Sequence, residues 1–174
     1  MSLKTALTVA TLGVLLVAGA ALAQQPAPNP LDNIPDKMPN DIPYGTPISL
    51  DNAQAAIAAA VAESKKRGWK LNVAVVDSGA NLVAFARQDG AQLASIAISE
   101  HKARAAVKYR RETKALEGGV QSGLNYLLTL DDVIASRGGI PLVADGRLVG
   151  AIGCSGGTGS QDEVASKAGA ATIK

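Results

Sequence analysis

The stretch PLVADGRLVGAIGC, residues 141–154, constrains the fold of this chain more than any other. Two apolar runs rich in β-forming residues flank the dipeptide Asp145-Gly146. Because aspartate and glycine adopt the positive φ angles of a two-residue turn, this stretch predicts a β-hairpin. Two further apolar runs, residues 71–77 and 82–88, flank the turn-forming sequence DSGAN and predict another hairpin. Two hairpins favour an antiparallel sheet.

Helical patterns surround the two hairpins. Ser49 is suited to cap a helix that ends before Gly68, and a second helix is expected over residues 92–109. Residues 113–128 are expected to form a short helical turn that Gly118-Gly119 breaks. The order helix, hairpin, helix, irregular segment, hairpin, helix predicts an α+β fold, with helices packed on the sheet.

The last helix is expected to follow the glycine-rich loop SGGTG. Ser160 and Glu163 have the S-x-x-E spacing of a capping box, so the helix is predicted to begin at Ser160.

The N-terminal part of the chain differs in composition from the rest. Residues 1–23 combine Lys4, an apolar run and a small-x-small site, which is typical of a secretory signal peptide, with an uncleaved membrane anchor as the alternative. Residues 24–47 hold seven of the eight prolines and are expected to form an extended arm, either a tether or a segment lying on a neighbouring subunit. The folded domain is expected over residues 48–174. Export to the periplasm or the medium follows from the signal pattern, and no later segment is long enough to span a membrane.

Charge and cysteine content exclude some classes of protein. Without Lys4, the only charged residue of the signal pattern, the 17 basic residues become 16, against 15 acidic ones. A chain so close to neutral lacks the basic excess of a nucleic-acid-binding protein. The single cysteine, Cys154, leaves no internal disulfide and is expected to be a buried, unreactive thiol.

The candidate functional residues gather in HKARAAVKYRR, residues 101–111, which contains the only histidine. At helical spacing, four of its residues share one face. These are His101, Arg104, Lys108 and Arg111. Such a face is either solvated or forms one wall of a site for an anionic ligand.

Neighbouring residues favour the ligand site. Arg87 ends the second strand and Asp89 follows it, and the glycine turns that contain Gly139 and Gly156 are expected where the sheet ends. Arginines and exposed amides suit a carboxylate. Two other kinds of site are excluded because the residues that they need are missing. One histidine cannot form a multi-histidine metal site, and SGGTG lacks the lysine of a phosphate-binding P-loop.

Three blocks of this sequence resemble the GlcG/HbpS family of haem-binding proteins and the C-terminal domain of PduO-type proteins. The blocks are VAVVDSGANLVAFARQDGA, SIAISEHKARAAVKYRRET and GGIPLVADGRLVGAIGCSGGTGSQDEVASKAG, and the resemblance covers residues 48–174. It implies a five-stranded antiparallel sheet, assembly into dimers up to octamers and, in some members, haem binding or haem degradation. Ala80 stands where the family has a glycine, and Glu112 where it has a proline.

The resemblance suggests an exported haem-binding protein with a role in haem or iron handling. Arg104, Lys108 and Arg111 are the expected partners of the haem propionates, and His101 is the expected iron ligand, with Tyr109 second. The family motif adds Thr113, Gly139 and Gly156 to the expected site. Two other functions stay open, namely a binding protein or enzyme for a small carboxylate using Arg87 and Asp89, and an oligomeric assembly module without a ligand. Nothing in the residues establishes catalysis.

Overall fold

The computed structural model describes residues 32–174. Its compact unit is formed by residues 38–174, and the account below concerns this unit. The predicted signal peptide, residues 1–23, lies outside the described residues, as does the arm up to residue 31. No helix within residues 32–174 combines the length and the apolar character that crossing a membrane requires.

A four-stranded antiparallel sheet forms the middle layer of the domain. The strands are β1 (Asn72–Asp77), β2 (Leu82–Arg87), β3 (Gly139–Ala144) and β4 (Arg147–Ser155). They lie in the order β2-β1-β4-β3, so each predicted hairpin is present and β1 pairs with β4 in the centre. The β3–β4 turn has positive φ at both Asp145 (49°) and Gly146 (71°), which confirms the two-residue turn expected there.

The expectation of five strands was wrong. In place of a fifth strand, the segment around Tyr44 forms one isolated parallel bridge with Leu148 of β4. Backbone hydrogen bonds join Gly45 and Ile48 to this strand as well. Pro43 and Pro47 carry no amide hydrogen, so this segment cannot form a continuous ladder.

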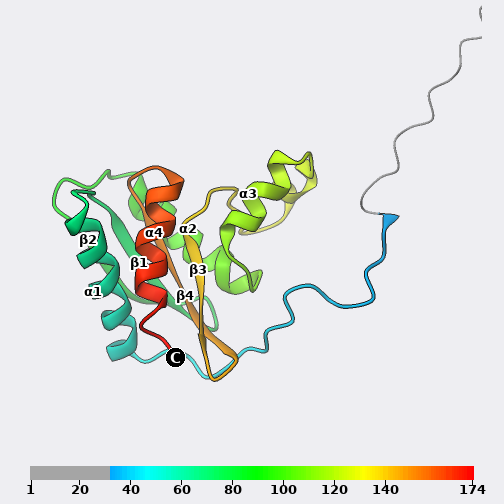
Figure 1. The fold of residues 1–174 in the computed structure, drawn as a ribbon, viewed down its shortest axis with the longest axis horizontal. Coiled ribbons are helices and arrows are strands. Elements are labelled where there is room, and N and C mark those ends of the chain that lie inside the picture. Colours follow the sequence, from blue (N-terminus) through cyan, green and yellow to red (C-terminus); the bar gives the residue numbers. More distant parts are fainter. Residues whose placement is uncertain (1–31) are drawn as a thin grey trace, which may run out of the picture. The chain divides into compact units, whose positions relative to one another are not determined.

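Helices cover both faces of the sheet (Figure 1). On one face, α1 (Leu50–Lys66) and α4 (Gly159–Ala170) lie side by side and enclose Val73, Val75 and Ile152. On the other face, α2 (Ser95–Lys108) packs on β1, β3 and β4 and encloses a smaller apolar core. The central strand β1 is therefore buried on both faces, from Asn72 to Val76.

Two glycines allow α2 to approach the sheet closely. A Cβ at Gly153 of β4 would lie 2.1 Å from the carbonyl oxygen of Ser99, and one at Gly139 of β3 would lie 2.2 Å from that of Lys102. Since real side chains do not reach such distances, only glycine permits this helix–sheet contact.

The helix boundaries confirm some sequence signals and correct others. Ser49 caps α1 as expected, accepting a hydrogen bond from the Asn52 amide. However, α4 begins at Gly159, and its capping box joins Thr158 to Gln161 rather than Ser160 to Glu163. Thr158 has the extended backbone of a capping residue (φ −70°, ψ 157°), whereas Ser160 lies inside the helix.

The expected break at Gly118-Gly119 is absent, because α3 (Thr113–Gln121) runs through both glycines. A 3₁₀ segment, η2 (Asn125–Thr129), follows it. A Cβ at Gly119 would lie 2.6 Å from a Leu127 methyl, so this glycine makes room for η2 rather than ending the helix.

Candidate functional site

A cleft of about 560 Å³ lies where α2 ends and α3 begins, against β3. Of the nine residues that line it, four are apolar and four are charged. Two of the nine, Asn40 and Ile42, come from the segment that precedes Tyr44. The lining residues are Asn40, Ile42, Arg110, Arg111, Glu112, Lys114, Ala115, Ile140 and Pro141. We call this the α2–β3 cleft.

The end of α2 brings two arginines to this cleft. Tyr109 is the C-cap, and Arg110 has a left-handed backbone (φ 52°) of the kind that glycine commonly supplies after a helix. The Arg111 amide then donates to the Ala106 carbonyl at 3.1 Å, which closes the last turn. The left-handed turn at Arg110, just after the end of α2, therefore places Arg110 and Arg111 together beside β3.

The charged residues of the cleft differ in their partners. The Arg110 guanidinium contacts the Asp41 carboxylate at 3.6 Å, Lys114 contacts Glu163 at 3.5 Å and Glu112 contacts Lys167 at 3.4 Å. Arg111 donates from Nε to the Tyr109 carbonyl at 3.2 Å and forms no ion pair within residues 32–174. Arg111 is thus the cleft residue whose guanidinium is available to a carboxylate, which it can hold through two parallel hydrogen bonds.

The rest of the predicted basic face of α2 lies elsewhere. His101, Arg104 and Lys108 line neither the α2–β3 cleft nor the two other well-formed cavities described within residues 32–174. Arg104 pairs with Glu100 at 2.9 Å, and Lys108 pairs with Asp132. A hydrogen bond from Lys108 lowers the pKa of Asp132, and the nearby His101 and Arg104 act in the same direction. These three residues therefore surround an acidic side chain.

Tyr109 contacts the same segment, because its hydroxyl donates to the Asp131 carbonyl at 2.5 Å. The predicted face is thus divided, with Arg111 at the cleft and the other residues at positions 131–132. Among residues 32–174, no group of three or more histidine, cysteine, aspartate or glutamate side chains is placed to hold a metal ion.

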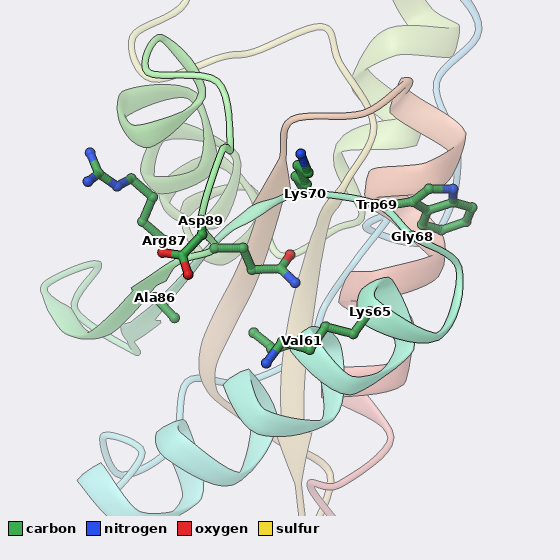
Figure 2. A pocket seen from close by; sticks show the side chains of 9 residues that line it. Val61, Lys65, Gly68, Trp69, Lys70, Ala86, Arg87 and Asp89 are labelled. Atoms are coloured by element: carbon green, nitrogen blue, oxygen red, sulfur yellow. The ribbon is translucent and has the colours of Figure 1, made fainter.

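Arg87 and Asp89 lie in a second pocket, of about 410 Å³, between α1 and β2 (Figure 2). Lys65, Trp69 and Lys70 also line it. Figure 2 shows the Arg87 guanidinium and the Lys70 ammonium pointing to different sides of the pocket, both away from Trp69. Arg87 and Lys70 therefore do not converge on one ligand position in this pocket.

Thr113, Gly139 and Gly156 support the backbone. Thr113 is fully buried, and its hydroxyl accepts a hydrogen bond from the Gly139 amide at 2.9 Å, which joins α3 to β3 beside the cleft. Gly156 has a φ of 142°, and a Cβ there would lie 2.5 Å from the Lys70 carbonyl oxygen. Both glycines therefore permit close backbone contacts.

A buried ion pair is the feature that the sequence did not reveal. Lys102 of α2 and Asp162 of α4 meet at 2.8 Å, with side chains only 2% and 3% exposed. Burial raises the pKa of Asp162, although Lys102 acts in the opposite direction. The Gly157 amide donates to the other carboxylate oxygen at 3.0 Å, so the pair fixes the glycine turn as well as both helices.

Helical spacing contained the signal for this pair. Lys102 falls three residues after Ser99 and four before Ala106, and both of these residues are fully buried. The position therefore faces the sheet rather than the basic side of α2.

An ionic network ties α3 and α4 together beside the cleft. Arg137 makes two short hydrogen bonds to the Glu117 carboxylate, 2.7 and 2.9 Å long, and its amide donates a third. These bonds hold the pKa of Glu117 below its usual range. Glu163 receives Lys167 at 2.6 Å and contacts Arg137 at 3.6 Å. The network positions α3, which carries Lys114 into the cleft.

The prediction that Cys154 is a buried thiol is confirmed. It is fully buried in β4, and burial raises its pKa to about 12. The thiolate, which is the reactive form, is therefore strongly disfavoured.

Comparison with known proteins identifies the family. Residues 48–171 match the family described as haem degrading protein HbpS-like. The chain belongs to the HbpS-like family. Protein GlcG of Escherichia coli strain K12 is 40% identical over 108 residues, which are 62% of this chain and 81% of GlcG.

Solved structures of family members share the fold. A double mutant of HbpS from Streptomyces reticuli superimposes with a TM-score of 0.70 at 31% identity, covering 86% of this chain and 99% of HbpS. A complex of PduOC with haem superimposes with a TM-score of 0.67 at 28% identity, covering 74% of this chain and 96% of PduOC. The α+β fold expected from the sequence is therefore confirmed in its coarse form, with four strands.

Proposed function

We propose that this HbpS-like chain binds haem, and that the α2–β3 cleft receives it. The observation that carries the proposal is the Arg111 guanidinium, which has no ion pair within residues 32–174 and borders a cleft of about 560 Å³ with four apolar lining residues. Haem is a flat apolar ring with two carboxylates, so it requires both features. The similarity to the PduOC–haem complex supports the same ligand.

The cleft residues fit two parts of the ligand. Arg111 and Lys114 would hold the carboxylates, and Ile42, Ile140 and Pro141 would contact the ring. Bound haem would supply an iron centre, but we assign no catalytic step to the chain.

The iron ligand is a separate part of the proposal. No histidine, cysteine, methionine or tyrosine is among the nine residues that line the cleft. His101, the ligand expected from the sequence, lies outside this lining, so binding in the cleft would depend on Arg111 and not on His101.

The biological setting is also proposed. The signal pattern of residues 1–23 supports export to the periplasm or the medium. Family membership supports a role in haem or iron handling, and the resemblance seen in the sequence implies a homo-oligomer, between dimer and octamer. The mass of the mature protein in solution tests the last point.

Titration of the mature protein with hemin tests the site. Arg111→Ala should weaken hemin binding at least about tenfold, because a hydrogen-bonded charge contact contributes about 1.5–3 kcal/mol. Arg147→Ala is the matched control, since Arg147 is exposed at the β3–β4 turn and does not line the α2–β3 cleft. The Soret absorbance band measures binding.

His101→Ala separates the two hypotheses. If the cleft binds haem as proposed, this variant keeps wild-type affinity. A large loss with His101→Ala, together with normal binding by Arg111→Ala, would move the site to the other part of α2.

A further inference from the structure

The segment Asn40–Tyr44 forms one wall of the α2–β3 cleft. Asn40 and Ile42 contribute side chains to its lining. The segment is joined to β4 by two backbone hydrogen bonds, from the Leu148 amide to the Pro43 carbonyl at 2.8 Å and from the Gly45 amide to the Leu148 carbonyl at 2.9 Å. The segment itself belongs to no helix and to no named strand within the described residues.

Tyr44 attaches this wall to the end of α2. Its hydroxyl lies 3.1 Å from the carbonyl oxygens of both Val107 and Lys108. Both carbonyls lie in the last turn of α2; the Val107 carbonyl also accepts from the Arg110 amide at 3.3 Å, whereas the Lys108 carbonyl is one of those that a helix end leaves without a helical partner. A single hydroxyl therefore caps α2 and fixes the wall, although the Tyr44 side chain itself does not line the cleft.

Arg110 makes the second attachment. Its guanidinium donates to the Ile42 carbonyl at 3.2 Å, contacts the Asp41 carboxylate at 3.6 Å and lies 5.7 Å from the centre of the Tyr44 ring. The residue holds these contacts with a left-handed backbone, which is unfavourable for a side chain other than glycine. Arg111, the proposed carboxylate partner, is the next residue.

We propose that Tyr44 and Arg110 are positioning residues for the ligand, and that the segment Asn40–Tyr44 is a detachable wall whose docking controls ligand affinity and release. This inference rests on the proposed function of the cleft. When the wall detaches, the cleft loses Ile42 and opens beside Arg111, so the ligand should bind more weakly and leave faster. Conversely, a bound ligand should hold the wall in place, because coupling between two equilibria is reciprocal.

The Tyr44→Phe variant tests the inference in the mature full chain. It removes the hydroxyl and keeps the ring, without altering any residue that lines the cleft. Hemin affinity should fall about three- to tenfold, the effect of losing the one hydrogen bond that a tyrosine hydroxyl donates. Transfer of hemin to apomyoglobin should become faster by a similar factor. Tyr126→Phe is the control, because Tyr126 is exposed on η2 and its hydroxyl makes no hydrogen bond within residues 32–174.

Hydrogen exchange at the Leu148 amide measures docking directly. In the ligand-free protein, Tyr44→Phe should speed this exchange, and hemin should slow it in the wild type. Arg110→Gly is a second variant, and it should still fold because glycine readily adopts the left-handed backbone of this position. It should weaken hemin binding without lowering the melting temperature.

The outcomes separate the two proposals. If wild-type protein and Tyr44→Phe bind hemin equally and hemin leaves Leu148 exchange unchanged, the wall proposal is overturned while the cleft proposal stands. If the wild type binds no hemin, both are overturned.

Discussion

Replacement of Lys102 by methionine should lower the free energy of unfolding by about 3–5 kcal/mol, because it leaves a buried carboxylate without its cation. Lys102 and Asp162 are 2% and 3% exposed and lie 2.8 Å apart, so water cannot replace the lost partner. The Gly157 amide still donates to Asp162 at 3.0 Å, but one neutral donor offsets little of the cost of burying a charge. Methionine has nearly the length of lysine, so the change leaves no large cavity.

The loss of unfolding free energy caused by Lys102→Met should depend on pH. Burial raises the pKa of Asp162 in the wild type, and removal of Lys102 should raise it further. An acid whose pKa is raised on folding favours the folded state when protonated, so its contribution is lost as pH rises. The deficit of Lys102→Met relative to wild type should therefore shrink as the pH is lowered from about 7 to about 5.

Urea denaturation followed by the fluorescence of Trp69, the single tryptophan, measures these free energies. Lys66→Met, at an exposed position on α1, is the control and should change stability by less than about 0.5 kcal/mol. The double variant with Asp162→Asn removes both charges and should recover more than about 1 kcal/mol relative to the sum of the single variants. A cost below about 1 kcal/mol for Lys102→Met, or simple additivity in the double variant, would refute the reasoning.

Two further predictions concern stability. Ala80 has a φ of 68°, so Ala80→Gly should raise the unfolding free energy by about 0.5–1 kcal/mol, whereas Ala62→Gly inside α1 should lower it by about 1 kcal/mol. Equal effects of the two variants in thermal denaturation would contradict a strained turn. Glu117→Gln should cost about 1–2 kcal/mol near pH 7, because Arg137 holds the pKa of Glu117 below its usual range. A depressed carboxyl stabilises the fold above its unfolded pKa and loses this effect as pH falls, so the gap from wild type should close below about pH 4, and a constant gap would argue against the ion pair.

Local sequence signals predicted most of the fold. Asp145-Gly146 specified its turn because positive φ is a property of those two residues, and Ser49 specified the start of α1 because its hydroxyl bonds within the next turn. Signals failed where distant residues decide the outcome. Glu163 matched a capping box in sequence, but in the fold it joins Arg137 and Lys167 instead.

The site was predicted only in part. The basic spacing on α2 singled out Arg111, which lines the α2–β3 cleft. It could not show that the helix ends at residue 108 and that the chain then turns at Arg110. The cleft also depends on Ile42 and Ile140, which are far apart in sequence and have no chemical signature. Contacts of this kind follow from the packing of the sheet and cannot be read from spacing.

Comparison of protoporphyrin IX with its dimethyl ester tests the central claim that Arg111 recognises a ligand carboxylate. Binding can be followed by fluorescence without any contribution from iron. The wild type should bind the free acid at least about tenfold more tightly than the ester, and Arg111→Ala should lose that preference. An unchanged preference in Arg111→Ala would contradict the assignment of the cleft.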